Sequence, residues 1–494
     1  MEKDQIIKEI KDNLKELLSR PLMTGNLPFN ENYLKKKRRF SLYLKLHLLQ
    51  NRIFSVFSSF SNDCRGIVVG HLAKVSQTKE GKRGDFTNIF LKNLLNENQI
   101  KTAELLIPTL KEKFLLWRLL DLGKMKRNQE VVLSYVSTQR KIKLNKEKLK
   151  KNLLSKIEEI KRLNREEEIP QYVPNIKKAE RKLDEFTEFI CSDAFVNYFF
   201  GLALGVKDFL ERAEPKFVIV NSLSGIRERL IIFVAGRMGI KTLFIPHGME
   251  GARVPKGDDI STDIRVSRMY NPEKKRETEN GREVWRLGPI CFGYLVEEER
   301  KKDAGKPALL YGSQAVIEDR RISKEEYISF LNRLFRTFRQ IQERENLLFL
   351  IKMHPREDPN IYKKALKRSG LNAKLIKKPF SVWIEELPDF DLKMVIFGYS
   401  TLGMEAIILK KALVSVVPDR IVRTFRPSSN YKQFGIPLYT EKDLKNFGKF
   451  VLSLLKNKEK RKSLAEEQKE LLQRSGVWLE KESLSSFLEY LNKI

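Results

Sequence analysis

The sequence predicts an α/β protein with two domains, each built on a doubly wound parallel sheet, and a cleft between them. At 494 residues, the chain exceeds what one hydrophobic core organises. Apolar runs of strand length alternate with amphipathic stretches of helix length in two separate regions, as expected of parallel strands joined by crossover helices. A charged, weakly apolar segment at 296–306 separates the regions, and we interpret it as a linker.

These patterns divide the chain into three regions. Residues 1–61 are predicted to form a basic helical N-terminal extension, in which the segment 34–40 contains five consecutive cations. Residues 62–296 form the first α/β domain, with a helical insertion at about 140–210. Residues 297–494 form the second α/β domain, which ends in charged helices.

The first domain contains a βαβ unit. A strand at 216–221 precedes a helix at 226–238, and Gly239 caps that helix. A second strand follows at 241–248, so the pair is expected to be parallel with a right-handed crossover. A further short strand is predicted at 283–290.

The second domain repeats the alternation of strands and helices. One helix opens at Ser323 with Glu326 three residues later, the pattern of a capping box. The apolar face of this helix comprises Tyr327, Leu331, Leu334, Phe338 and Ile341. The strands are predicted, in chain order, at 307–314, 347–355, 372–378, 393–401 and 412–418.

The chain carries a large positive charge. Lys and Arg exceed Asp and Glu by 95 − 64 = 31, and the pI is about 9.8. This charge fits an anionic partner, such as nucleic acid, an acidic membrane leaflet or a phosphorylated substrate, and it equally fits a Lys-rich solvated surface. We find no zinc finger, RNP-type strand or recognition-helix pattern, and we therefore expect no nucleic-acid partner.

Membrane contact is expected to be peripheral. The charged start of the chain lacks the apolar segment of a signal peptide, and the apolar run 194–206 is shorter than the roughly 20 residues that span a bilayer. The basic segment 142–163 has an apolar stripe that either packs on the protein or lies on anionic lipid. Three dispersed cysteines fit a reducing compartment, so we expect a cytoplasmic protein at the inner face of the cell membrane.

Polar residues collect where predicted strands end. In open parallel sheets, ligands bind outside the carboxyl ends of the strands. His247 ends a strand in the first domain, and His354 ends one in the second. Ser400 and Thr401 follow a third strand, at the start of a predicted helix whose N–H groups favour phosphate.

His354 is the main candidate among these residues. Pro355 biases His354 to an extended backbone and removes one donor. Lys352 and Arg356 flank it, and cations around an imidazole suit a pyrophosphate better than a metal ion. The imidazole can serve as a neutral or as a charged donor, and the sequence leaves both open. A satisfied structural histidine at a strand end is the simpler alternative.

In their order along the chain, these motifs resemble the GT-B glycosyltransferases that build surface polymers. The motif "PHG" ends a strand in the first half, "KMHP" ends one in the second, and "YSTLGMEAIILKKALV" follows. The group includes capsular polysaccharide Kdo transferases, bacterial polysialyltransferases and CDP-glycerol glycerophosphotransferases. The resemblance covers residues 216–418 and implies two Rossmann-like domains that face a cleft.

The resemblance also implies roles for individual residues on the donor side. His354 would contact the donor phosphate, and Glu405 would accept hydroxyls of the nucleotide ribose. Tyr399 stands where a Ser-Ser pair is common in the family, but the hydroxyls that follow it are kept. The other donor-binding positions would be Lys352, Arg356, Ser400, Thr401, Ser313 and Gln314.

On the acceptor side, the resemblance implies that His247 is the catalytic residue. Gly248 and Glu250 would lie beside it, although the pair Met249-Glu250 departs from the family pattern and leaves the acceptor chemistry open. One histidine near the leaving phosphate and another near the acceptor hydroxyl would supply what transfer requires.

The implied function is transfer of a sugar or glycerol phosphate from a nucleotide-activated donor to a cell-surface polysaccharide or lipid-linked acceptor. We expect no cofactor and no metal, because no ligand cluster is visible and the DxD-like pair Asp389 and Asp391 is interpreted as a loop. Three alternatives remain. They are a non-hydrolysing UDP-sugar 2-epimerase, faintly suggested by "HGMEGAR", a catalytically dead scaffold, and a basic nucleic-acid-binding protein.

Overall fold

The chain forms two units, each an α/β layer structure, in this computed structural model. The first unit comprises Met1–Ser267, Glu273–Arg286 and Ser485–Ile494, and the second comprises Arg268–Pro272 and Leu287–Leu484. The structure describes residues 2–24, 64–71, 75–77, 83–85, 88–107, 130–133, 142–164, 176–177, 180–223, 225–246, 260, 262–267, 270–279, 281–295, 305–317, 321–354, 357–376, 390–398, 402–425, 433–477 and 479–494.

The first unit is built on an eight-stranded sheet in the order β5-β4-β1-β6-β7-β8-β10-β9. All neighbouring strands run parallel except β9, which is antiparallel to β10 at one edge. A separate two-stranded hairpin pairs β2 with β3. The strands are β1 (Gly66–His71), β2 (Val75–Gln77), β3 (Arg83–Asp85), β4 (Thr102–Ile107), β5 (Glu130–Val132), β6 (Phe217–Val220), β7 (Lys241–Phe244), β8 (Ile264–Ser267), β9 (Arg276–Glu279) and β10 (Arg282–Arg286).

The predicted βαβ unit is confirmed. Strands β6 and β7 pair in parallel, with Phe217 opposite Lys241, and α11 (Ile226–Arg237) connects them. Gly239 follows the helix with a φ of 75°, a conformation that glycine adopts without the strain of a Cβ atom. The other helices of this unit are α1 (Lys3–Asp12), α2 (Leu14–Thr24), α5 (Ile89–Glu97), α7 (Lys146–Leu163), α9 (Leu183–Ile190) and α10 (Asp193–Ala213).

The sequence predicted that residues 1–61 form a separate helical extension. The structure corrects this for the first two helices, which belong to the first unit. Ile6 and Ile10 of α1, and Leu17 of α2, are fully buried in the same hydrophobic core as the strands of the first unit. Residues 25–63, including the run of five cations, lie outside the described residues. The apolar periodicity of α1 and α2 therefore reflects packing into the core of this unit.

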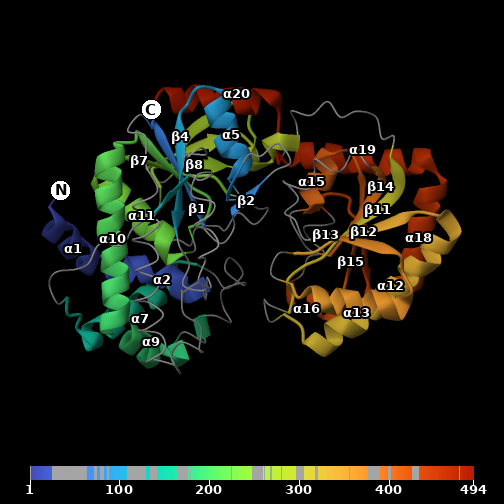
Figure 1. Cartoon of the computed structure of the whole chain (residues 1–494), viewed down its shortest axis with the longest axis horizontal. Coiled ribbons are helices and arrows are strands. Elements are labelled where there is room, and N and C mark those ends of the chain that lie inside the picture. The colour runs from blue at the N-terminus through green and yellow to red at the C-terminus, as the bar shows by residue number, and fades with distance from the viewer. Residues whose placement is uncertain are drawn as a thin grey trace. The chain divides into compact units, whose positions relative to one another are not determined.

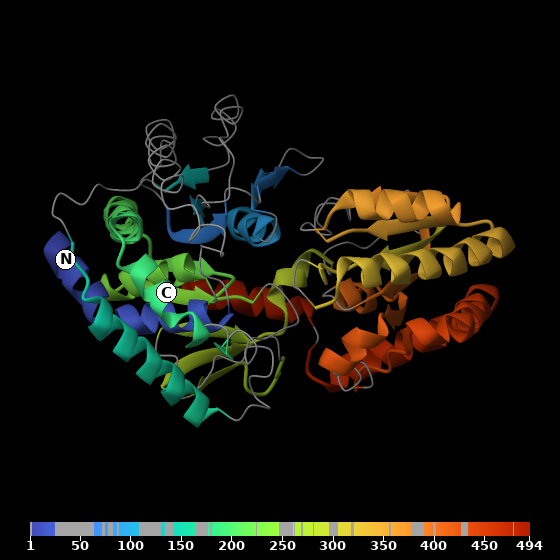
Figure 2. The same cartoon turned by 90° about the horizontal axis from the view of Figure 1, so that it is seen from below.

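The apolar stripe of α7 also packs on the protein. Leu149, Leu153, Ile157 and Ile160 are buried, and α7 runs alongside α2 (Figure 2). Of the two interpretations of this basic helix, packing within the unit is confirmed, because the stripe that would enter lipid is already covered.

Helix α10 contains the apolar run 194–206. Its side chains Phe195, Phe199 and Phe200 are buried in the first unit's core and contact one another edge to face or stacked. Within the described ranges, a single helix with the length and apolar character needed to cross a membrane is absent, although α9 and α10, bent by 59°, reach that length and composition as a pair.

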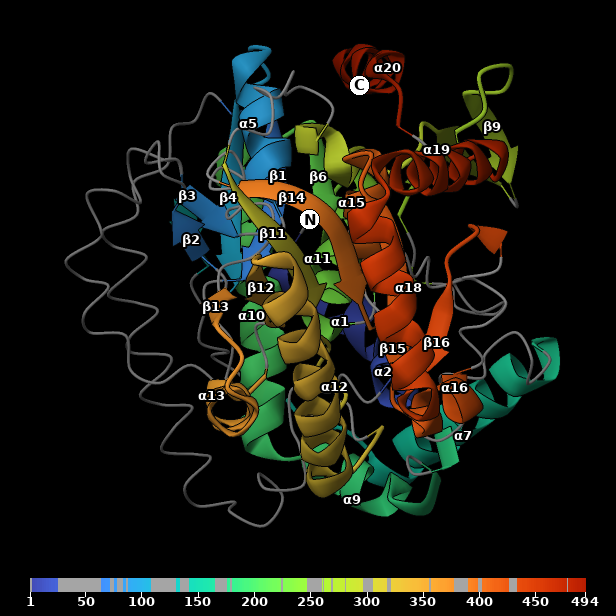
Figure 3. The same cartoon turned by 90° about the vertical axis from the view of Figure 1, so that its right-hand side faces the viewer.

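The second unit is built on a six-stranded parallel sheet in the order β13-β12-β11-β14-β15-β16 (Figure 3). Helices α12 and α13 lie on one side of this sheet, and α15 and α19 lie on the other (Figure 1). The strands are β11 (Lys306–Gly312), β12 (Leu348–Lys352), β13 (Ala373–Ile376), β14 (Phe390–Phe397), β15 (Ala412–Val417) and β16 (Leu438–Thr440). The prediction of two α/β units on mainly parallel sheets is therefore confirmed.

The long helix of this unit begins as predicted. Ser323 accepts from the N–H of Glu326, whose carboxylate accepts from the N–H of Ser323, and the predicted apolar face is buried. The helical elements of the second unit are α12 (Lys324–Glu345), α13 (Pro359–Ser369), α15 (Leu402–Ile408), α16 (Asp419–Phe425), α18 (Leu444–Lys456) and α19 (Lys458–Arg474), with short 3-10 turns at Ile290–Leu295 and Glu441–Asp443.

Two features differ from the sequence-based expectations. The end of α20 (Lys481–Asn492) groups with the first unit, where Phe487 and Tyr490 pack against Trp285 and Arg65 donates to Asn492 at 3.0 Å. Asp391 lies inside β14 rather than in a loop, because the strand starts at Phe390. Asp389 is outside the described residues.

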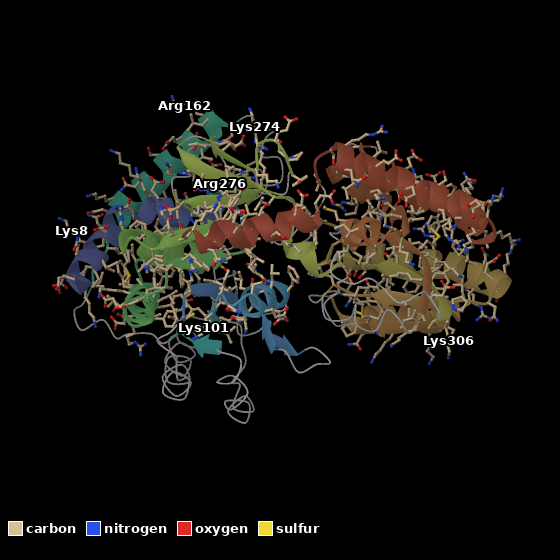
Figure 4. The ribbon with its side chains drawn as sticks, turned by 90° about the horizontal axis from the view of Figure 1, so that it is seen from above. Lys8, Lys101, Arg162, Lys274, Arg276 and Lys306 are labelled. Atoms are coloured by element: carbon tan, nitrogen blue, oxygen red, sulfur yellow. The ribbon has the colours of Figure 1, made fainter. Side chains whose placement is uncertain are left out.

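Exposed cations come from many elements of the first unit. Figure 4 labels Lys8 on α1, Lys101 before β4, Arg162 on α7 and Arg276 on β9, and all four are exposed. Some are neutralised locally, since Arg276 forms an ion pair with Glu283. The positive charge is therefore distributed over the unit rather than confined to its N-terminal segment.

Candidate functional site

Three strands of the second sheet end level with one another. Gly312, the last residue of β11, pairs with Lys352 of β12 on one side and with Phe397 of β14 on the other. The chain proceeds from β11 to β12, whereas β14 joins the opposite edge of β11, so the strand order reverses between β11 and β14. This switch point is where open α/β sheets bind ligands.

Backbone hydrogen bonds hold the residues just beyond these strand ends. The N–H of Ser313 donates to the Lys352 carbonyl at 2.9 Å, and the N–H of Gly398 donates to the Gly312 carbonyl at 3.1 Å. The side chain of Gln314 lies over Gly398, with its Oε1 atom 3.7 Å from the point that a Cβ atom there would occupy. The segments after β11, β12 and β14 are therefore brought together, as the sequence predicted.

Hydrogen bonds to its backbone groups hold His354 in place. Its N–H donates to the Oε2 atom of Glu357 at 2.7 Å and approaches the Oγ atom of Ser313 at 3.3 Å. Its carbonyl accepts from the N–H of Glu357 at 3.0 Å. The His354 residue itself is half-buried, while Glu357 is buried.

The sequence reasoning missed Glu357. This carboxylate also accepts from the hydroxyl of Ser313 and from the phenols of Tyr362, at 2.6 Å, and Tyr327, at 3.4 Å. The bond to the N–H three residues earlier is one half of a capping box, but the sequence signature of that motif has Ser or Thr where this chain has His354, so the sequence carried no signal for it. Ser313, expected to border the donor, is buried and points into this network.

Burial keeps the tyrosines of the network protonated. The pKa values of Tyr327 and Tyr362 are raised well above their usual range by burial, and the nearby Glu357 carboxylate raises them further. Tyr327 and Tyr362 are also hydrogen bonded to each other at 2.8 Å. Both phenols therefore stay available as donors throughout the pH range in which the fold is expected to work.

The side chains of Lys352 and Glu405 lie close enough for their charges to interact, at the same strand ends of the second sheet. Both side chains are 8% exposed, and the Lys352 ammonium donates to the Met353 carbonyl at 2.7 Å. Burial lowers the pKa of Lys352 to about 8, while the carboxylates of Glu405 and Glu357 act in the opposite direction. Because charges interact more strongly away from water, the two carboxylates favour the charged form of this shielded ammonium and partly offset its positive charge.

The helix that carries Glu405 is packed closely against the strand ends. All seven residues of α15 are buried, and a Cβ atom on Gly312 would lie 2.1 Å from the Cδ2 atom of Leu402. Gly403 approaches the ring of Phe397 in the same way, with 2.8 Å to its Cε2 atom. Glycine at these two positions therefore lets the helix approach β11 and β14.

Six of the predicted site residues lie outside the described residues. On the donor side, these are Arg356, Ser400 and Thr401. On the acceptor side, the description of β7 and its continuation stops at Pro246, and His247, Gly248 and Glu250 follow it. The roles expected for these six residues stay predictions.

The first unit has a switch point of its own, between β1 and β6. There the Asn88 amide donates to the Val69 carbonyl at 2.6 Å, and the Asn221 amide donates to the Asn88 side-chain oxygen at 3.0 Å. His71 is the last residue of β1. The sequence analysis did not predict β1, although "GIVVGH" is an apolar run that ends in histidine, as the strands before His247 and His354 do.

The described residues include no group of three or more His, Cys, Asp or Glu side chains placed to hold a metal ion. Metal independence nevertheless stays a prediction, since part of both strand-end regions is not described.

Comparisons with known proteins give structural likeness but no sequence family. No protein-family model matches the sequence, and no curated protein matches it. The chain is similar to a UDP-GlcNAc 2-epimerase from Neisseria meningitidis bound to UDP-GlcNAc, with a TM-score of 0.49 and 11% identity over 87% of this chain and 99% of that one.

Two further solved structures illustrate the same likeness. MurG from Acinetobacter baumannii has a TM-score of 0.43 and 8% identity over 87% of this chain and 100% of that one. An α,α-trehalose-phosphate synthase (UDP-forming) from Burkholderia vietnamiensis has a TM-score of 0.41 and 8% identity over 87% and 99%. At these scores and identities, function has to be argued from the site.

Proposed function

We propose that this chain is a transferase that uses a nucleotide-activated donor. The observation that carries the proposal is made at the switch point of the second sheet, where Lys352 ends β12 close to Glu405 and the backbone of His354 is held beside Ser313. This is the position at which α/β sheets bind nucleotides, and the groups present can meet a phosphate and a ribose. The donor would be a nucleotide sugar, or CDP-glycerol, as the family resemblance implies.

In this proposal, the second unit stabilises the leaving group. The imidazole of His354 donates to the donor phosphate, and Arg356, Ser400 and Thr401 add donors around it. Lys352 supplies positive charge near the phosphate, and the Glu405 carboxylate accepts hydrogen bonds from the ribose hydroxyls. Charge that develops on the phosphate as its bond to the transferred group breaks is thereby met by donors already in place.

The first unit would carry the acceptor. His247 takes the proton from the acceptor hydroxyl as its oxygen attacks the transferred group, and Gly248 and Glu250 line the acceptor side. The acceptor is a surface polysaccharide or a lipid-linked glycan. We propose that the reaction takes place at the cytoplasmic face of a membrane.

The proposal is tested by calorimetric and thermal-shift titration of CMP, CDP, UMP, UDP, GDP and a short single-stranded oligonucleotide. We expect one nucleotide to bind the wild type and to bind at least tenfold more weakly to His354→Ala and Glu405→Ala. Glu343→Ala, which removes an exposed glutamate of α12, is the matched control and should bind normally.

Other outcomes would overturn the proposal. Tight, salt-sensitive oligonucleotide binding that neither variant changes would indicate a nucleic-acid-binding protein. Conversion of a UDP-sugar to its 2-epimer without any acceptor would indicate an epimerase.

We also propose that α13 contacts the anionic lipid surface. This helix has four exposed cations and no acidic residue, whereas the exposed side of α7 carries both signs, with Glu147 and Glu158 among its cations. The pairs Lys363 with Lys367 and Lys364 with Arg368 are four residues apart, so like charges repel along the helix unless an anionic partner is present. Each cation near an anionic leaflet contributes about 1 kcal/mol.

The test is sedimentation with vesicles of phosphatidylcholine alone or with phosphatidylserine. Replacing the four α13 cations by glutamine should abolish binding to the anionic vesicles. Replacing four cations of α19 is the matched control, since that helix alternates cations with glutamates and should matter little. Equal loss in both variants would show that only net charge counts.

A further inference from the structure

Glu357 forms hydrogen bonds with both backbone polar groups of His354, the N–H and the carbonyl. Its carboxylate accepts from the N–H of His354 at 2.7 Å, and its own N–H donates to the carbonyl of His354 at 3.0 Å. One side chain and one amide thus fix the peptide groups on either side of the imidazole. The first of these bonds is one half of a capping box, and the second is a backbone hydrogen bond that closes the turn.

We propose that Glu357 is a positioning residue that places His354 at the phosphate site of the second unit. The inference rests on the proposed function for the identity of the ligand, but not for the geometry. Glu357 would act through His354 and would not itself contact the ligand.

The hydrogen bonds of Glu357 support this division of roles. Its Oε2 atom accepts from the His354 N–H and the Ser313 hydroxyl, and its Oε1 atom accepts from Tyr362 and Tyr327. Because Tyr362 gives its one phenol proton to Glu357, the 2.8 Å bond between the phenols uses the proton of Tyr327, whose 3.4 Å contact with Oε1 is the weakest of the four. Donors from the protein still occupy most of the roughly four acceptor positions of the carboxylate. The side chain is also only 8% exposed, which leaves little room for a ligand to reach it.

The charge of Glu357 has local partners. Lys352 lies close enough for the two charges to interact, and every hydrogen-bonding neighbour donates to the carboxylate. Donors to an ionised acceptor form stronger hydrogen bonds than donors to a neutral one. An uncharged side chain of the same shape should therefore hold the His354 turn less firmly.

The side chains that hold the Glu357 carboxylate are far apart in the sequence and come together only in the folded unit. Ser313 follows β11, Tyr327 lies on α12, and Tyr362 lies on α13. These three elements surround the loop between β12 and α13, so the carboxylate is held from three directions. Such preorganisation matters, since a displacement of about 1 Å at a reacting group can reduce a rate by roughly 100-fold.

The experiment is a double-mutant cycle with Glu357→Gln and His354→Ala. Affinity is measured by calorimetry for inorganic pyrophosphate and for the nucleotide that binds the wild type. We expect Glu357→Gln to weaken binding at least tenfold in the wild-type background and less than twofold in the His354→Ala background. Equal weakening in both backgrounds, or none in either, would overturn the proposal, because a merely structural residue does not act through His354.

A second variant keeps the test valid if Glu357→Gln fails to fold. Tyr362→Phe retains the carboxylate and removes its 2.6 Å phenol donor. We expect a smaller loss of affinity that also disappears in the His354→Ala background. Tyr327→Phe removes the 3.4 Å contact to Glu357 and the 2.8 Å bond between the two phenols, but it keeps the Tyr362 donor, and it should therefore have a smaller effect than Tyr362→Phe.

Positioning of His354 by Glu357 can be tested even if no nucleotide binds. If the wild type binds neither pyrophosphate nor any nucleotide, the proposed function fails, but the imidazole of His354 can still be followed by nitrogen NMR. Its signals are assigned by their loss in His354→Ala. A shift of those signals alone in Glu357→Gln supports positioning, and unchanged signals overturn it.

Discussion

The buried charge of Lys352 makes a quantitative prediction. The side chain is 8% exposed, and burial lowers its pKa from 10.5 to about 8 even though Glu405 and Glu357 favour the charged form. One pKa unit corresponds to about 1.4 kcal/mol. Holding this ammonium charged in the folded protein therefore costs about 3 kcal/mol relative to the unfolded chain.

The sign of the pH dependence follows from proton binding. Below pH 8 the lysine is protonated in both states, so the whole penalty is present. Between pH 8 and 10.5 the unfolded chain binds more protons than the folded one, and stability rises with pH. The variant Lys352→Met keeps the length of the side chain and removes this titration.

The assay is urea unfolding at pH 7, 8, 9 and 10, followed by circular dichroism. We expect the free energy of unfolding of the wild type to rise relative to that of Lys352→Met by about 2 to 3 kcal/mol across this range. Other groups titrate in both proteins and cancel in the difference. Lys363→Met, on the exposed face of α13, is the matched control and should show no such trend.

A flat difference between the wild type and Lys352→Met would refute the reasoning, since it would mean that the ammonium is not desolvated. A difference that falls with pH would mean that attraction to the two carboxylates outweighs burial. The functional counterpart is that affinity of the wild type for a nucleotide should weaken above pH 8, as the ammonium loses its proton.

Three further predictions concern the scaffold. Gly66→Ala should destabilise the first unit by about 1 to 3 kcal/mol in urea unfolding, because its Cβ atom would lie 2.2 Å from a ring atom of Phe217, and a normal stability would contradict the packing of β1 on β6. Ile157→Ala should lower the free energy of unfolding by about 2 to 5 kcal/mol and leave vesicle binding unchanged. Loss of vesicle binding with normal stability would instead indicate that the apolar stripe of α7 contacts lipid. Ser323→Ala should cost about 1 kcal/mol in the same assay, and no loss would mean that the cap of α12 is replaceable.

Local patterns predicted much of the second unit and part of the first. The capping box and buried face of α12 depend on residues three and four apart, and the pairing of β6 with β7 depends on a continuous βαβ segment. In both cases the deciding contacts are close in the sequence. The same is true of His354 at the end of β12, where an apolar run stops.

Other features had no local signal that decided them. The stripe on α7 is equally suited to lipid or to protein, and only the presence of α2 beside it shows which one covers it. Asp391 resembles a loop residue next to Asp389, but pairing of β14 with β11 extends the strand over it. The end of α20 returns to the first unit because Trp285 offers it an aromatic surface.

By itself, the sequence determined the two α/β units, their parallel strands and the histidine at the end of β12, since hydrophobic periodicity and turn residues act over a few positions. Only the tertiary structure decided which side chains support that histidine. Ser313, Tyr327 and Tyr362 reach Glu357 from three different elements. A buried carboxylate needs donors from every side, and those donors come together only once the sheet and its helices have assembled.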